Sequence, residues 1–292
     1  MKPVRTDFAC FPYVVDAAFL KEHRQAVVLV DVRWYLDGRS GEASYQAGHL
    51  PGAVFLDIDR DLSGPPGPGG RHPLPDLEVL RTALQQAGIG TDDGVIAYDD
   101  SGGLSAARLV FLLRALGIRA AILDGGIASY DGPLESSVSI PSPTTLAFTG
   151  FAGEMMIDID SLERRITQGC ILLDVRTEER YRGVREPIDP VAGHIPGARN
   201  LPTMGLLKPS GHFLSPQGLR QQFSAVGIGP SDEVVVYCGS GVTACHTWLA
   251  LQHSGHRKVR LYPGSWSEWC NSPGRPIATG DETSSTGKIL TP

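Results

Sequence analysis

Apolar runs and helix-forming stretches alternate along the chain, and the series occurs twice. Continuous apolar runs predict buried strands at residues 27–32, 54–57, 94–98 and 120–123 in the first half, and at 171–175, 198–201, 233–237 and 259–262 in the second. Stretches that predict helices lie between them, at 77–87, 104–116, 216–226 and 242–253. Buried strands that alternate with helices are typical of a mostly parallel sheet flanked by helices on both faces. The pattern therefore predicts an α/β fold that is built twice.

Short sequence markers recur in the same order in both halves, offset by 139 to 145 residues. They are Asp31-Val32-Arg33 and Asp174-Val175-Arg176, the turn Gly-His-(Leu/Ile)-Pro-Gly-Ala from Gly48 and from Gly193, Tyr98-Asp99 and Tyr237-Cys238, and Asp124-Gly125-Gly126 opposite Pro263-Gly264-Ser265. An ordered set with a nearly constant offset indicates a tandem duplication. We predict an N-terminal domain over residues 1–135, a linker over 136–154 and a C-terminal domain over 155–292. Since His49 and His194 occur in both halves, we interpret them as structural turn residues.

Residues 63–75 interrupt the apolar pattern of the first half. The segment holds four Gly and five Pro, which makes it too polar and too kinked for a core. We expect an excursion that could fold over another part of the protein.

Composition narrows the choice of partners. The 292 residues are 41% apolar and 20% charged, with a net charge of −6 and no prominent basic run, so neither nucleic acid nor an anionic membrane is expected to bind. No apolar stretch approaches the roughly 18 residues that a membrane span requires. The five cysteines, Cys10, Cys170, Cys238, Cys245 and Cys270, are widely spaced and include no C-x-x-C pair. This argues against disulfides and a metal site, and for free thiols in the cytoplasm.

Cys238 is the residue with the clearest chemical signal. It directly follows the apolar run 234–237 and opens the loop Cys238-Gly239-Ser240-Gly241-Val242-Thr243, after which a helix is predicted. Backbone N–H groups and the positive end of the helix dipole converge at such a position and stabilise a thiolate, the reactive form of cysteine. We expect the N–H groups of residues 239–243 to form an anion nest, which Gly239 and Gly241 make possible.

These markers together resemble the two-domain rhodanese family of sulfurtransferases over nearly the whole chain. The resemblance rests on the Asp-Val-Arg markers, on the Gly-His-(Leu/Ile)-Pro-Gly-Ala turn in both halves, on the Cys238 loop and on Gly264-Ser265-Trp266-Ser267-Glu268-Trp269. It implies two rhodanese-like domains, of which only the second carries the nucleophile. Asp99 stands in the cysteine position of the first half, and because a carboxylate cannot form a persulfide, the N-terminal domain is expected to be catalytically silent.

The uncharged loop resembles that of the 3-mercaptopyruvate sulfurtransferases, whereas members that prefer thiosulfate commonly carry Arg or Lys there. The resemblance implies a Ser-His-Asp relay of Ser240, His72 and Asp59. It also implies two arginines for the substrate carboxylate. Arg180 aligns with the first, Pro187 occupies the second position, and Arg185 is the candidate substitute. Gly239, Gly241, Val242 and Thr243 complete the expected substrate-binding loop.

The expected reaction is a double displacement. The Cys238 thiolate takes a sulfur from 3-mercaptopyruvate, and a thiol, a thioredoxin-like protein or cyanide then takes it from the persulfide. No metal or organic cofactor is expected. Three alternatives stay open: a thiosulfate sulfurtransferase with the same nucleophile, a sulfur carrier that does not turn over, and a phosphatase. The phosphatase is disfavoured because position 244 is Ala where phosphate binding needs an Arg.

Overall fold

The computed structural model of the protein describes residues 11–281 and 288–290, so Cys10 lies outside the described residues. The chain divides into two compact units. The described residues up to Gly64, together with Pro75–Ala152 and Lys208–Phe213, make up the first unit. The second comprises Pro65–Leu74, Gly153–Leu207 and the described residues from Leu214 onward. The predicted excursion, residues 63–75, therefore falls largely in the second unit.

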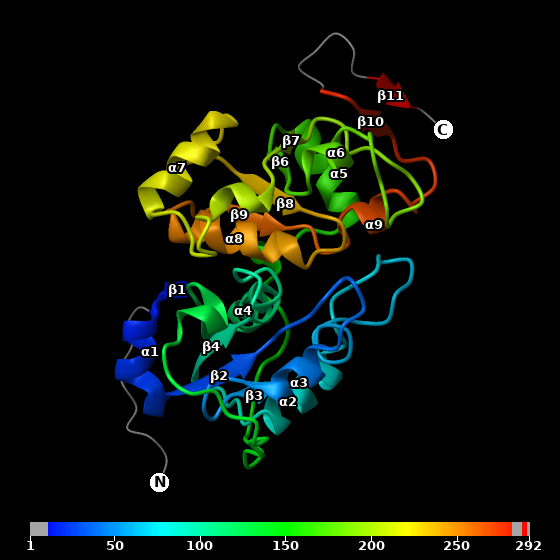
Figure 1. Ribbon diagram of the computed structural model, residues 1–292. Helices are drawn as coiled ribbons and strands as arrows, with labels where there is room; N and C mark the ends of the chain where they lie inside the picture. Colours follow the sequence, from blue (N-terminus) through cyan, green and yellow to red (C-terminus); the bar gives the residue numbers. More distant parts are fainter. Residues whose placement is uncertain (1–10, 282–287, 291–292) are drawn as a thin grey trace. The chain divides into compact units, whose positions relative to one another are not determined.

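A five-stranded parallel sheet forms the centre of the first unit, in the order β1-β5-β4-β2-β3 (Figure 1). Its strands are β1 (Val14–Val15), β2 (Val27–Asp31), β3 (Val54–Phe55), β4 (Gly94–Tyr98) and β5 (Arg119–Leu123). Its helices are α1 (Ala17–His23), α2 (Gly41–Ala47), α3 (Leu77–Gln86) and α4 (Ala106–Ala115), with short 3-10 turns at Arg24–Ala26 and Gly126–Ser129. Every residue of the central strand β4 is buried, as expected for a strand with both faces covered.

The second unit repeats this plan with a four-stranded parallel sheet in the order β7-β6-β8-β9. The strands are β6 (Ile171–Asp174), β7 (Arg199–Asn200), β8 (Val234–Tyr237) and β9 (Val259–Leu261), and a separate antiparallel pair is formed by β10 (Ile277–Thr279) and β11 (Lys288–Leu290). The helices are α5 (Ile159–Thr167), α6 (Glu178–Tyr181), α7 (Pro216–Ala225), α8 (Thr243–His253) and α9 (Ser265–Trp269), with 3-10 turns at Gly153–Met155 and Thr203–Leu206. Two parallel sheets with flanking helices confirm the predicted α/β fold class.

The predicted strands and helices agree with the structure to within about two residues at their ends, and the differences concentrate at sheet edges. The edge strands β3 and β7 are two residues long, where runs of four were expected. An edge strand pairs on one side only, so its apolar residues continue past its last ladder hydrogen bond. The edge strand β1 was not predicted, because two valines form no recognisable run.

The duplicated markers tie a strand to a turn in each unit. The Arg33 guanidinium binds the Asp31 carboxylate and donates to Gly48 O at 2.7 Å, and Arg176 makes the same contacts with Asp174 and with Gly193 O at 2.6 Å. The His49 ring stacks on Tyr45 and the His194 ring on Tyr181, with ring centroids 3.9 and 3.8 Å apart. These contacts are consistent with a structural role for both histidines.

The predicted linker packs against α3 of the first unit. Arg81 Nη1 donates to Leu146 O at 2.9 Å, and its guanidinium lies 4.1 Å from the centre of the Phe148 ring. The amide of Thr144 donates to Gln85 O at 3.3 Å. The first unit accordingly extends to Ala152, while the domain limits drawn from the sequence stay a prediction. Among the helices of the described residues, none has the length and apolar character that crossing a membrane requires.

Candidate active site

Cys238 follows the last residue of β8 and lies 3% exposed at the carboxyl end of the second sheet. In open parallel sheets this is the edge at which ligands bind. The amide N–H of Gly241 donates to Cys238 Sγ at an N···S distance of 3.2 Å. At least one loop amide therefore points at the sulfur, as the predicted anion nest requires.

Residues at the start of α9 set the orientation of the loop. The amides of Trp266 and Ser267 donate to the carbonyls of Cys238 and Gly239 at 3.0 and 2.8 Å. In a trans peptide the C=O and the following N–H point in opposite directions. Because α9 holds these two carbonyls, the amides of Gly239 and Ser240 point away from α9. This orientation lets the amides of Gly239 and Ser240 face an anion bound at the loop.

Ser265 holds the cysteine itself. Its hydroxyl accepts a hydrogen bond from the Cys238 amide at 3.1 Å and donates to Tyr262 O at 3.0 Å. Ser265 is fully buried, and at φ 55° it has the one positive φ among the non-glycine residues that the structure describes. This left-handed conformation costs a non-glycine residue about 1–3 kcal/mol. The equivalent position in the first unit is Gly126, at φ 57°.

Asp99 of the first unit reveals the capacity of the shared loop to bind an anion. Its carboxylate accepts five hydrogen bonds of 2.7–3.0 Å, from the amides of Ser101, Gly103, Ser105 and Ala106 and from the Ser105 hydroxyl. Four of these five donors are backbone N–H groups of the loop and of the start of α4. In the first unit the carboxylate therefore occupies an anion nest, and the duplication leads us to expect equivalent donors at Cys238.

Glycines allow this loop to close. Gly102 and Gly241 occupy equivalent positions at φ 73° and 79°. A Cβ on Gly241 would also lie 2.2 Å from Pro263 O, so no other residue fits without a shift of the backbone. The helix α8 that follows has Val242 as its N-cap and no side-chain cap, so its first amides are not used by a capping side chain. Thr243 is its first residue.

His72 and Ser240 meet beside the cysteine. His72 Nδ1 lies 2.7 Å from Ser240 Oγ. His72 belongs to residues 65–74, here called the strap, which Arg71 fastens by donating its amide to Ser267 Oγ at 3.1 Å. Gly70 turns the strap at φ 101°, where a Cβ would lie 2.7 Å from Ser267 Oγ. The N-cap of α8 is Val242, and the Ser240 hydroxyl two residues earlier pairs with the His72 imidazole.

Asp59, the third predicted member of the relay, belongs to the first unit. There its Oδ2 accepts from the Trp34 indole N–H at 2.8 Å, and its amide donates to Asp57 Oδ1 at 2.8 Å. Its role toward His72 stays a prediction.

Arg180 reaches the cysteine loop within a network of charged groups. Its guanidinium donates to Glu186 at 2.8 and 3.0 Å and to Asp189 Oδ2 at 3.2 Å. A Cβ on Gly239 would lie 3.3 Å from its Nη2. Burial by itself raises the pKa of Glu186, but hydrogen bonds from Arg180 and from the amides of Asp189 and Ile188 outweigh burial and hold that pKa below its ordinary value. Glu186 is therefore charged and fixes Arg180.

Arg185, the candidate second arginine, has an exposed side chain. Its amide donates to Glu179 O at 3.2 Å at the end of α6.

Four residues of the site were not predicted from the sequence: Arg71, Glu186, Asp189 and Ser265. Arg71, Glu186 and Asp189 belong to none of the motifs that carried the resemblance. Ser265 lies in the motif at residues 264–269 and aligns with Gly126 in the duplication, but neither signal assigned it a role at Cys238.

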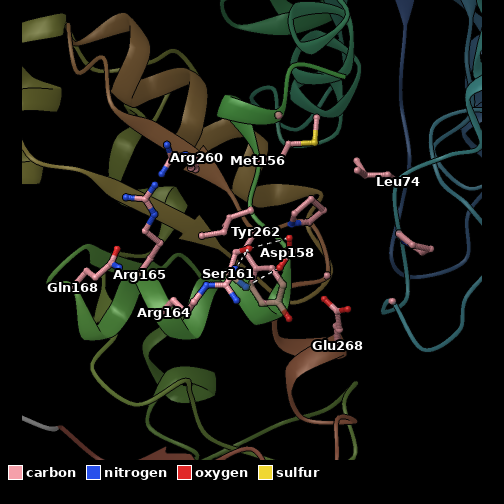
Figure 2. Close-up of a pocket in the computed structure, with 16 residues that line it drawn as sticks. Leu74, Met156, Asp158, Ser161, Arg164, Arg165, Gln168, Arg260, Tyr262 and Glu268 are labelled. Atoms are coloured by element: carbon pink, nitrogen blue, oxygen red, sulfur yellow. Dashed lines mark hydrogen bonds between the residues drawn. The ribbon is translucent and has the colours of Figure 1, made fainter. Parts of the chain in front are cut away.

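A separate cavity of about 800 Å³ lies in the second unit (Figure 2). In this view Arg164, Arg165 and Arg260 of its lining lie on the left, and Leu74 and Glu268 lie on the right. Cys238 does not line it. The chemistry of the loop, rather than the size of this cavity, therefore identifies the candidate active site.

Comparison with known proteins agrees with this geometry. The model of the rhodanese-like domain matches the chain twice, at residues 16–132 and 158–272. A Pseudomonas aeruginosa protein named probable 3-mercaptopyruvate sulfurtransferase is 45% identical over 267 residues, covering 87% of this chain and 93% of its own length. The human 3-mercaptopyruvate sulfurtransferase is 34% identical over 269 residues, and the match covers 88% of this chain and 89% of the human protein. A Mycobacterium tuberculosis relative, 41% identical over 262 residues with 87% and 91% covered, is provisionally named a thiosulfate sulfurtransferase.

Solved structures give the same result. The crystal structure of SseA from Escherichia coli, described as a 3-mercaptopyruvate sulfotransferase, superposes with a TM-score of 0.77 at 31% identity and covers 88% of this chain and 100% of its own. The 3-mercaptopyruvate sulfurtransferase from Leishmania major superposes with a TM-score of 0.78 at 31% identity, and the match covers 88% of this chain and 74% of the Leishmania chain. With both units matched and a cysteine loop in the second alone, the chain belongs to the rhodanese family.

Proposed function

We propose that this protein is a 3-mercaptopyruvate sulfurtransferase that carries the transferred sulfur as a persulfide on Cys238. The observation that supports it most directly is the amide of Gly241 directed at Cys238 Sγ in a loop whose counterpart in the first unit binds a carboxylate. The same loop contains no cation that would favour a doubly charged inorganic donor.

In the first step, the Cys238 thiolate attacks the sulfur of mercaptopyruvate. A new S–S bond forms while the C–S bond of the donor breaks, and the electron pair of that bond leaves with the carbon as the enolate of pyruvate. Protonation of the enolate gives pyruvate and leaves a persulfide on Cys238. The loop amides and the start of α8 stabilise the anionic sulfur throughout.

Ser240 and His72 act on the proton and on the negative charge that builds on the ketone oxygen of the donor. The hydroxyl and the imidazole are within hydrogen-bond distance of each other, so the pair can donate a proton toward the enolate and recover it from water. Asp59 orients the imidazole in this proposal, by the logic of catalytic triads. Arg180 binds the donor carboxylate, while Gly239, Gly241, Val242 and Thr243 shape the anion nest.

In the second step, the thiolate of an acceptor attacks the outer sulfur of the persulfide. The S–S bond to Cys238 breaks, the acceptor leaves as a persulfide, and Cys238 returns as a thiolate. A small thiol, a thioredoxin-like protein and cyanide all have the nucleophilic chemistry that this step requires. The cytoplasmic location and the absence of a cofactor stay predictions from the sequence.

The decisive experiment compares 3-mercaptopyruvate and thiosulfate as donors at matched concentrations, with intact-protein mass spectrometry of the enzyme after each. We expect mercaptopyruvate to add the mass of one sulfur atom to the wild type and to Cys270→Ser, and to leave Cys238→Ser unmodified. Faster turnover with thiosulfate would favour the second candidate function, which the name of the mycobacterial relative supports. A persulfide that forms but passes to no acceptor would indicate a sulfur carrier. Turnover by Cys238→Ser would exclude the mechanism altogether.

A further inference from the structure

A second guanidinium lies at the cysteine loop, and it comes from the strap. The Arg71 amide is fixed by Ser267 Oγ, and its Nη1 donates to Asp189 Oδ1. Its other terminal nitrogen, Nη2, would lie 2.9 Å from a Cβ on Gly239. The Arg71 side chain is 27% exposed, so its guanidinium is partly buried but still accessible to a ligand from solvent.

Arg71 and Arg180 form a matched pair around Asp189. Asp189 gives Oδ1 to Arg71 and Oδ2 to Arg180, with its side chain 2% exposed. One buried carboxylate thus spaces two guanidiniums and leaves nitrogens of both directed toward Gly239. Because Glu186 and Asp189 neutralise the two cations, selection of a ligand here depends on the directions of the N–H groups more than on net charge. Planar guanidinium donors suit a carboxylate.

Arg185 is a poorer candidate for this place. Its side chain is exposed, and its backbone amide donates to Glu179 O at the end of α6. By contrast, no Cβ could be added to Gly239 without a close approach to Arg71. The absence of a side chain at Gly239 lets both guanidiniums approach the backbone directly beside Cys238.

We propose that Arg71, together with Arg180, binds the carboxylate of an α-keto acid donor on the Gly239 side of the loop. This inference rests on the proposed function and deepens it. The strap then supplies both the carboxylate contact, from Arg71, and the proton relay, from the neighbouring His72. The sulfur of a bound donor is directed to Cys238 because its carboxylate is held one residue away.

The test compares 3-mercaptopyruvate with its methyl ester, which undergoes the same chemistry without a carboxylate. Arg71→Met should lower kcat/KM for the acid by about 10- to 100-fold, through KM, and change that for the ester less than about 2-fold. Arg71→Lys should restore part of the loss, since an ammonium keeps the charge without the planar fork. The control is Arg182→Met, the same change at an exposed arginine paired with Glu178, which should leave both donors unaffected.

Each result separates the two proposals. If Arg71→Met lowers kcat/KM equally for the acid and the ester, or leaves KM for the acid unchanged, the assignment of Arg71 is overturned. Formation of the persulfide on Cys238 in the same experiment would leave the proposed function intact. If the wild type takes up sulfur at Cys238 from neither donor, the proposed function fails and this inference fails with it. Thermal unfolding of Arg71→Met identifies a folding defect, and Arg71→Lys then decides the outcome.

Discussion

The hydroxyl of Ser265 lies 3.1 Å from the amide nitrogen of Cys238 and holds that cysteine at the head of its loop. Gly126 occupies the same left-handed position in the first unit, where Asp99 replaces the cysteine. The first unit has glycine, which adopts this conformation without strain. The unit with the cysteine has a strained residue with a hydroxyl, which indicates that the hydrogen bond matters where the chemistry occurs.

Substitution of Ser265 separates strain from hydrogen bonding. Ser265→Gly loses the hydroxyl and relieves the backbone, so its free energy of unfolding should stay within about 1 kcal/mol of the wild type. Ser265→Ala loses the hydroxyl and keeps the strain, so it should be about 1–2 kcal/mol less stable than the wild type. Both should react more slowly with iodoacetamide at Cys238 and transfer sulfur more slowly. Urea unfolding and alkylation rates check this, and a fully active Ser265→Gly would show that the hydroxyl is dispensable.

His72 and Ser240 should behave as one unit. His72→Ala and Ser240→Ala should each lower kcat with mercaptopyruvate by about 100-fold or more, because either change interrupts the proton path. The double variant should be no slower than the worse single variant, since effects of residues that act together are not additive. Steady-state kinetics measure this. If the fold-loss of kcat in the double variant equals the product of the two single losses, His72 and Ser240 act independently and the proposed relay is wrong.

Asp99 should contribute to stability and not to turnover. Asp99→Ala leaves buried donors of the first loop without an acceptor, each at a cost of about 1–3 kcal/mol, so we expect a loss of at least about 3 kcal/mol. Sulfur uptake at Cys238 should be unchanged well below the unfolding temperature. Asp100→Ala, at an exposed neighbour that accepts from Tyr35, serves as the control and should cost less than about 1.5 kcal/mol. A large loss of activity in Asp99→Ala at equal foldedness would contradict a purely structural role.

Glu186 should make stability depend on acid pH. Its pKa in the folded protein lies below its ordinary value of 4.5, so the unfolded chain takes up a proton at higher pH than the folded one. The stabilisation is present above pH 4.5 and is lost as pH falls through the folded pKa. Urea unfolding at pH 7, 4.5 and 3 should show the difference between wild type and Glu186→Gln shrinking with falling pH. Glu178→Gln, at an exposed helical pair, should show a smaller pH dependence, and an equal one would contradict the assignment.

The sequence by itself determined the fold class, the duplication and the place of Cys238 at the head of a glycine-containing loop. Continuous apolar runs specify strands buried on both faces, and a helix after a glycine-containing loop fixes where Cys238 must lie, because these signals depend on neighbours along the chain. The match of Asp99 to Cys238 follows from spacing alone, without the five hydrogen bonds that the Asp99 carboxylate accepts.

Only the tertiary structure decided what surrounds the sulfur. Arg71 and His72 lie within a Pro/Gly segment of the first half, yet they contact Asp189, Ser267 and Ser240 of the second unit. Contacts between residues that lie 118 to 196 positions apart in the chain leave no periodic pattern in the sequence. The left-handed φ of Ser265 likewise cannot be predicted from the fact that the residue is a serine. The chain specifies its strands locally, whereas the polar groups around Cys238 are brought together by packing, because hydrogen bonds and ion pairs depend on distance in space.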